Sequence, residues 1–270
     1  MKRRLVRRAT RDEQLSVVDH LHELRTRIII AMASLVIAFL GLYLVRNDLL
    51  DLLQEPLPAR YQATGLITLS PTEPFFTTLK VCFWAALLLA IPVWLYQVYA
   101  FVIPAFRDQS RRVMLVIVAG ISALFLAGVA FGYYVVLPVA LDFLLGFGQD
   151  QFQAEVQAAK YYGFATALML GSGLMFEVPA AMVAFARMGI VTADQYIAQW
   201  RVALVGIAAF AAILPGGDPF SMFLLMLPQI ALYSLGVVLA RRFGKPLLWR
   251  SDDDENDDEP DPWTNTGGPD

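Results

Sequence analysis

Val-Asp-His-Leu-His-Glu-Leu-Arg-Thr-Arg, residues 18–27, runs directly into the apolar stretch Ile28–Val45, and this junction decides how the chain folds. The apolar stretch is long enough to cross a bilayer as a helix. At helical spacing Asp19, Glu23 and Arg27 share one face of the preceding segment, and its apolar residues share another. A membrane anchor is therefore joined to a surface with fixed carboxylates. A carboxylate is the natural partner of a guanidinium group, because its two oxygens match two N–H donors.

The composition is that of an integral membrane protein. Hydrophobic residues make up 57% of the 270 residues and charged residues 17%, against about 25% charged in a soluble domain. The mean hydropathy is +0.55. The two histidines and the single cysteine lack the spacing of metal ligands, and the sequence has no nucleotide-binding loop or nucleophile motif. We expect no enzyme activity, no metal or other cofactor and no nucleic-acid partner.

Six apolar runs predict an all-α fold with six transmembrane helices. The fifth run has about thirteen residues, or ~20 Å as a helix, which is shorter than the ~30 Å hydrocarbon core. Either neighbouring helices shield its ends or the bilayer thins around it. Prolines inside the runs favour a concave bundle of kinked helices, although proline is also commoner in membrane helices generally. The runs are Ile28–Val45, Phe76–Phe101, Val113–Leu145, Tyr161–Ala186, Val202–Leu214 and Phe220–Ala240.

Lysine and arginine are concentrated on one side of the predicted membrane, and this asymmetry sets the orientation of the spans. The basic N-terminus, the loop with Arg111 and the segments with Arg187 and Arg241 fall on that side. The opposite loops carry fewer basic residues, among them Arg46 and Arg60. The alternation through six crossings predicts that both termini are cytoplasmic.

The charge distribution also divides the chain into three parts. Residues 1–27 are predicted to form a basic cytoplasmic N-terminus with the amphipathic segment, and residues 28–245 a six-helix transmembrane domain. Residues 246–270 are rich in Asp and Glu and poor in apolar side chains. Because such a segment cannot bury enough apolar surface to fold, we expect a disordered cytoplasmic tail there.

Glu177 is the most informative single residue inside the predicted membrane domain. An acidic side chain at the bilayer centre costs roughly 2.5–3.5 kcal/mol, so it usually has a function or a partner. Gly173 lies one turn away and lets another helix come close, while Pro179 frees a backbone carbonyl nearby. We interpret Glu177 as a docking point for a partner helix; the alternative is an internal hydrogen bond that fixes the bundle. A proton-coupled small-molecule transporter that titrates Glu177 is an alternative function, although it leaves the segment around Glu23 unexplained.

Three further features have structural interpretations. Gly128 and Gly132 form a pair of small residues at helical spacing, which is typical of close packing between helices. Asp218 lies in the turn before the sixth run, where it is predicted to cap a helix. Glu23 and Arg27 are four residues apart, so an ion pair on the helix surface, worth a few tenths of a kcal/mol, is the structural alternative to a binding role for Glu23.

Several short segments occur in an order that is specific as a whole, and together they resemble the TatC family, the receptor and core subunits of the twin-arginine protein translocase. The resemblance covers roughly residues 17–245. It implies six helices in a concave shape in the cytoplasmic membrane, with both termini cytoplasmic. The segments are His20–Arg27, Glu55–Leu57, Ser70–Phe76, Tyr96–Phe101, Pro104–Ala105, Arg111–Arg112, Tyr133–Pro138, Phe176–Pro179 and Asp218–Phe220.

The resemblance also implies a function and a set of partners. TatC proteins bind the twin-arginine signal peptides of folded cargo and recruit TatA and TatB, which are single-span proteins, and the proton-motive force drives transport. Membrane lipids and further copies of the chain within a receptor complex are expected as additional partners.

Roles for individual residues follow from the same resemblance. Glu23 matches the family's first signal-binding carboxylate, with Arg25 beside it. Phe101 matches a functional aromatic residue, and Arg111 belongs to the arginine pair of the first cytoplasmic loop. Glu177, followed by Pro179, matches the intramembrane carboxylate. Pro56 and Asp218 match features on the extracytoplasmic side.

The chain departs from the family pattern in the first cytoplasmic loop. The family usually places a glutamate just before the arginine pair, whereas this chain has Ser110 there. We hypothesise that Asp108, two residues earlier, supplies the second acidic contact for the signal's arginines.

Overall fold

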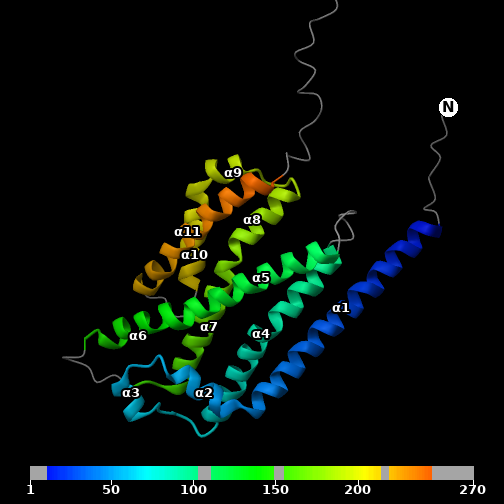
Figure 1. Cartoon of the computed structure of the whole chain (residues 1–270). Coiled ribbons are helices and arrows are strands. Elements are labelled where there is room, and N and C mark those ends of the chain that lie inside the picture. Colours follow the sequence, from blue (N-terminus) through cyan, green and yellow to red (C-terminus); the bar gives the residue numbers. More distant parts are fainter. Residues whose placement is uncertain (1–10, 103–110, 149–154, 214–218, 245–270) are drawn as a thin grey trace, which may run out of the picture. The chain divides into compact units, whose positions relative to one another are not determined.

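The computed structural model describes residues 11–102, 111–148, 155–213 and 219–244, and nearly all of them are helical (Figure 1). The only β contact among these residues is an isolated bridge between Ile67 and Gln157. The predicted all-α fold is therefore confirmed. The elements are α1 (Arg11–Leu44), α2 (Arg46–Gln54), α3 (Ala59–Thr64), α4 (Glu73–Val102), α5 (Arg111–Phe131), a π-helical turn (Gly132–Val136), α6 (Leu137–Gly146), α7 (Ala158–Phe176), α8 (Val178–Arg187), α9 (Ala193–Ala198), α10 (Trp200–Ile213) and α11 (Pro219–Phe243).

Nearly all the described residues of the predicted apolar runs lie in helices. Within the described residues, five helical stretches are long and apolar enough to cross a membrane. The sixth apolar helix, α10, has 14 residues and so measures ~21 Å, well short of a bilayer's hydrocarbon core. The prediction of a short fifth helix is therefore confirmed. The five long stretches are Leu21–Leu44, Glu73–Val98, Val116–Gly146, Ala158–Arg187 and Pro219–Phe243.

The third run changes helix type just before a proline. Pro138 lacks the N–H that would bond to the carbonyl of Tyr134, so a regular helix cannot continue through this point. The chain forms the π-helical turn Gly132–Val136 immediately before α6, and Pro138 sits in the first turn of α6. A local change of helix type of this kind keeps backbone groups bonded where water is absent.

The fourth run divides at Glu177. Helix α7 ends at Phe176, α8 begins at Val178, and Pro179 follows at once. The backbone N–H of Glu177 donates to the carbonyl of Leu174 at 3.2 Å, three residues back instead of four. Of the other prolines, Pro92 and Pro228 lie inside α4 and α11; Pro104 lies outside the described residues.

The described residues fall into two compact units, one of residues 1–177 with 208–228 and the other of 178–207 with 229–270. In the first unit α5 and α7 approach closely because small residues face each other. A Cβ atom on Gly128 would lie 2.7 Å from the carbonyl oxygen of Ser172, and one on Gly173 would lie 2.7 Å from Cε2 of Phe125. The predicted packing role of the Gly128 and Gly132 pair is confirmed.

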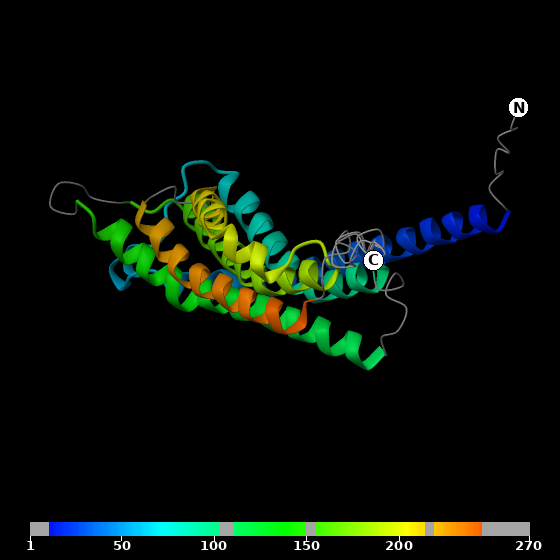
Figure 2. The ribbon, with the colours of Figure 1, turned by 90° about the horizontal axis from the view of Figure 1, so that it is seen from above.

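Helices α1 and α4 lie side by side in the same unit (Figures 1 and 2). The indole N–H of Trp94 donates to the carbonyl of Ala31 at 2.9 Å. Leu35, Ala86 and Ala90 are buried between the two helices. The N-terminal part of α1 continues beyond α4 (Figure 2). Leu21 and residues 28–30, which are nearer to Ala31, are exposed.

Tyrosine hydroxyl groups fasten α2 to the transmembrane helices at the other end of the unit. The hydroxyl of Tyr133 donates to the carbonyl of Leu52 at 2.7 Å, and that of Tyr161 donates to the carbonyl of Leu53. These carbonyls belong to the last turn of α2, where helical donors run out, although the carbonyl of Leu52 also accepts from the backbone N–H of Glu55 at 3.3 Å. The hydroxyl groups therefore act as caps supplied from other helices.

Glu73 performs a similar task at the start of α4. Its carboxylate accepts hydrogen bonds from the backbone N–H of Leu69 at 2.8 Å and of Ala159 at 3.2 Å, and from the side-chain amide of Gln157 at 3.0 Å. The same segment pairs with the chain before α7 through Ile67. One carboxylate therefore joins the starts of two long helices.

The second unit has its own interior of small and aromatic residues. A Cβ atom on Gly236 would lie 2.5 Å from Sδ of Met182, so α8 and α11 pack tightly. The hydroxyl of Tyr233 donates to the carbonyl of Tyr196 at 2.8 Å. Thr192 and Gln195 form a capping box at the start of the short helix α9.

Replacing Gly128 with valine tests whether the α5–α7 approach determines stability. The added side chain meets backbone and Phe176 atoms closer than 3 Å, so we expect a loss of about 1–3 kcal/mol in the free energy of unfolding. The measurement is thermal unfolding of the purified protein in detergent. Gly120→Val is the matched control, because nothing lies within 4 Å of a Cβ at that position of the same helix. Equal losses in the two variants would contradict the prediction.

Candidate functional site

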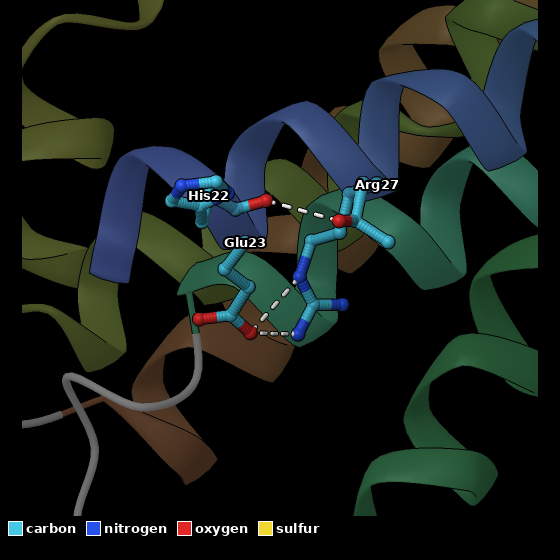
Figure 3. Close-up of polar contacts among 4 residues, drawn as sticks. His22, Glu23 and Arg27 are labelled. Carbon is cyan, nitrogen blue, oxygen red and sulfur yellow. Dashed lines mark hydrogen bonds and ion pairs between the residues drawn. The ribbon is translucent and has the colours of Figure 1, made fainter. Parts of the chain in front are cut away.

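Glu23 lies on α1 close to the start of its apolar part, and it forms an ion pair with Arg27 (Figure 3). Arg27 donates from Nε at 3.1 Å and also from Nη2, both to the same carboxylate oxygen, Oε1. The pair forms because an uninterrupted helix places residues four apart on one face. The Glu23 side chain is 39% exposed and that of Arg27 20%. The predicted helix-surface pair is thus present in the structure.

The helical segment 18–27 as a whole has no net charge. Arg25 is exposed and lies about 200° around the helix from Glu23, so it does not share the face of the carboxylate. Thr26 donates its hydroxyl hydrogen to the carbonyl of His22 at 3.0 Å, within the helix. Two carboxylates and two guanidinium groups leave residues 18–27 with a formal charge of zero. Further carboxylates are needed before the surface becomes anionic.

The backbone brings the end of α4 to the level of Glu23. Glu23 precedes Ala31 by about two helical turns (~12 Å), and Phe101 follows Trp94 by about two turns (~10 Å). Because Ala31 and Trp94 are hydrogen-bonded, Glu23 and Phe101 lie at the same end of the α1–α4 pair. Arg111 begins α5. The side chains of Phe101 and Arg111, and Asp108 as a whole, lie outside the described residues.

Glu177 lies at the junction of α7 and α8. Its Oε1 atom is buried and has no hydrogen-bond partner among the described residues, and the carboxyl group lies beside the backbone of Phe125 in α5. The hydroxyl oxygens of Ser122 in α5 and Ser172 in α7 are also buried and have no hydrogen-bond partner among the described residues. Buried polar atoms are normally bonded. One carboxyl oxygen of Glu177 is therefore unsatisfied inside an apolar region, while the group accepts a hydrogen bond from the backbone of Phe125.

The small-residue face near Glu177 is already occupied. Gly173, one turn earlier, contacts the ring of Phe125 and the side chain of Val129 within the same unit. A partner helix could not use the Gly173 side for close approach. Pro179 is buried in the first turn of α8, where a proline is tolerated because that position needs no helical donor.

Of the two residues predicted to lie on the extracytoplasmic side, Pro56 and Asp218, the structure describes only Pro56. Pro56 is half-buried in the turn between α2 and α3, which is closed by a hydrogen bond from the N–H of Leu57 to the carbonyl of Gln54 at 2.9 Å. Leu57 is 2% exposed and anchors the turn in the core. Asp218 lies outside the described residues.

Some residues that organise this region were given no role from the sequence, although Glu73 and Tyr133 lie in segments that resemble the family. The hydroxyl groups of Tyr133 and Tyr161 and the carboxylate of Glu73 hold α2, α4 and α7 together. The available signal was their position, because tyrosines concentrate at the ends of membrane helices. Within the described residues, no group of three or more His, Cys, Asp or Glu side chains could hold a metal ion.

These features define a multi-pass helical membrane protein with a polar helix end and an ionisable group at an intramembrane junction, and the chain is similar to several known proteins. The family model described as Sec-independent protein translocase protein (TatC) matches residues 19–228. The chloroplastic TATC protein of Arabidopsis thaliana is 36% identical over 235 residues, covering 87% of this chain and 68% of that protein. TatC of Escherichia coli strain K12 is 35% identical over 226 residues, covering 83% and 88%.

A solved structure gives the same result. The crystal structure of the twin-arginine translocase receptor TatC in DDM superposes with a TM-score of 0.74 at 31% identity, covering 82% of this chain and 99% of that one. The chain belongs to the TatC family of Sec-independent protein translocase proteins. It spans about two thirds of the length of its chloroplast relatives, 68% for Arabidopsis and 66% for Pisum sativum.

Replacing Glu177 with leucine distinguishes the two interpretations of this residue. Because Oε1 has no partner among the described residues, removing the carboxyl group should stabilise the isolated protein by about 1–3 kcal/mol. The measurement is the free energy of unfolding in detergent, with Leu174→Ile, an apolar change one turn away, as the control. A loss of stability in Glu177→Leu would support the internal hydrogen bond instead.

Proposed function

We propose that this chain is the receptor and core subunit of a twin-arginine protein translocase, which binds the twin-arginine signal peptides of folded proteins. Membership of the TatC family supports the class of function. The single observation that carries the site is the Glu23 carboxylate, held half-exposed on an unbroken helix at the N-terminal end of the apolar stretch Leu21–Leu44. The comparisons do not support a small-molecule transporter.

Recognition at Glu23 follows from the shapes of the two groups. A carboxylate accepts two parallel N–H bonds from one guanidinium, whereas an ammonium group offers a point charge without the fork. At a partly shielded position a charge-assisted hydrogen bond contributes roughly 1.5–3 kcal/mol. Fixing Glu23 on a rigid helix lowers the entropy lost on binding.

A second acidic group is required for the second arginine. Residues 18–27 are formally neutral, with Asp19 and Glu23 against Arg25 and Arg27, so this segment alone gives a ligand with two guanidinium groups no net attraction. We assign the second contact to Asp108, in the loop between α4 and α5. Phe101 at the end of α4 supplies apolar contact beside it, and Arg25 and Arg111 flank the site.

Glu177 is assigned to the partner helices. A carboxyl group with an unsatisfied oxygen inside the membrane destabilises the isolated subunit and becomes favourable once a helix with a polar side chain reaches it. TatA- and TatB-type single-span proteins are the partners that the family implies, and Pro179 maintains the helix break at the junction. Transport then draws on the proton-motive force, with no catalytic step in this chain.

The orientation in the membrane is part of the proposal. Both termini are placed in the cytoplasm of a cell whose cytoplasmic membrane holds the protein, with residues 1–27 as the basic N-terminal part, 28–245 as the membrane domain and 246–270 as the acidic tail. Pro56 and Asp218 then lie on the extracytoplasmic side. The distribution of lysine and arginine supports this orientation, and we expect several copies in one receptor complex.

Export of a twin-arginine reporter should fail in Glu23→Gln. The amide keeps the size of the side chain but removes the charge that pairs with a guanidinium, so a fall of at least tenfold in export rate corresponds to the loss of one charge-assisted bond. Reporter activity outside the cytoplasm measures it. Asp48→Asn, which neutralises an exposed carboxylate in α2, should leave export unchanged. Normal export in Glu23→Gln would remove Glu23 from the site.

Asp108→Lys tests the second contact. Reversing the charge places an ammonium group against the second arginine, so photocrosslinking from position 23 to an Arg-Arg signal peptide should be abolished. The control is Ser110→Glu in the same variant, which restores a carboxylate at the position where the family usually has one and should recover crosslinking. Unchanged crosslinking in Asp108→Lys would exclude Asp108.

A further inference from the structure

The Glu23 carboxylate is already occupied by a guanidinium group from its own helix. Arg27 directs both Nε and Nη2 to Oε1, while Oε2 takes part in neither bond (Figure 3). Arg27 is also the less exposed of the two side chains, at 20% against 39%. The pair is therefore partly shielded from water, where charge-assisted hydrogen bonds are stronger than on an open surface.

We propose that Arg27 is an internal competitor for Glu23, which an arginine of the signal peptide must displace before it can form a two-oxygen fork. This inference rests on the proposed function, because it takes Glu23 as the carboxylate that binds the signal. Arg27 is then a residue that sets the affinity threshold of the receptor, distinct from the residues that contact the signal.

The exchange conserves the chemistry of the bond. One guanidinium replaces another, so the number of N–H···O contacts at the carboxylate does not fall. Arg27, however, is tethered one turn away, and a tethered group has a high effective concentration compared with a free ligand. A peptide with one arginine offers only what Arg27 already supplies. A peptide with two arginines adds a second contact, and the extra binding free energy allows it to displace Arg27 from Glu23.

A lysine of a peptide ligand can bind the Glu23 carboxylate without displacing Arg27. An ammonium group needs only one acceptor oxygen, so it can bind Oε2 while Arg27 stays on Oε1. Arg27 therefore lowers the affinity for ligands that require both oxygens and leaves single-oxygen ligands nearly unaffected. The displaced Arg27 does not become a buried unpaired charge, because its long side chain can extend to water or to lipid headgroups at the interface.

The test measures binding of labelled signal peptides to the full-length protein in nanodiscs. Arg27→Gln should bind an Arg-Arg peptide about two- to tenfold more tightly. This is the range expected when one ion pair is removed, from a fully exposed pair on a helix surface to a partly shielded pair. A Lys-Lys peptide should gain clearly less. Arg27→Lys keeps the charge but loses the fork, so its gain should be intermediate, and it carries the test if Arg27→Gln does not fold.

Arg25→Gln is the matched comparison, because it removes the same charge two residues away from Glu23 without releasing the carboxylate. An equal gain in Arg25→Gln and Arg27→Gln, or an equal gain for Arg-Arg and Lys-Lys peptides, would overturn the competitor role. In a Glu23→Gln background the effect of Arg27→Gln should vanish. If Glu23→Gln itself leaves Arg-Arg binding intact, the proposed function fails, which is a separate outcome.

Discussion

Backbone hydrogen bonding in a medium without water is the constraint on which this structure depends. Every N–H and C=O group in the hydrocarbon region needs a partner within the protein, so each interruption of a helix requires a local solution. At Pro138 the solution is a π-helical turn, and at Glu177 it is a bond to the carbonyl three residues back. At the end of α2 the carbonyls of Leu52 and Leu53 accept tyrosine hydroxyl groups from other helices.

The same constraint explains the rigidity of the candidate site. Helix α1 runs from Arg11 to Leu44 without a break, so Glu23 belongs to the same continuous helix as the apolar part. That helix is attached to α4 through the Trp94–Ala31 bond and the buried Leu35. The N-terminal part of α1 has an exposed apolar stripe that includes Leu21 and Ile28, and the surrounding lipid interface suits it. Position and orientation of Glu23 are therefore set by packing that lies two turns away.

Much of the fold could be predicted from the sequence because hydrophobic length is a strong signal in membrane proteins. The apolar runs, the short α10 and the packing of Gly128 all followed from length and residue size. The tyrosine caps and the role of Glu73 could not, because each joins segments far apart in the chain, and no spacing rule links Tyr161 to the carbonyl of Leu53. For the site, the i, i+4 relation gave the Glu23–Arg27 pair. That both Arg27 donors use one oxygen depends on side-chain rotamers, which sequence spacing does not determine.

The free energy of a single charge-assisted contact explains why the proposed site needs more than one acidic group. A single charge-assisted contact of roughly 1.5–3 kcal/mol corresponds to a preference of about 10- to 150-fold. Arginine is common on protein surfaces, so a receptor with one open carboxylate would bind many unrelated cations. As the proposed internal competitor, Arg27 would lower this single-contact affinity by about two- to tenfold, and a ligand with a second cation in register would recover it. The pair of Glu23 and Arg27 is weak as a source of stability. In the proposed role that weakness is useful, because a weak internal bond lowers the affinity for single charges and is still exchanged readily by a ligand that makes two contacts.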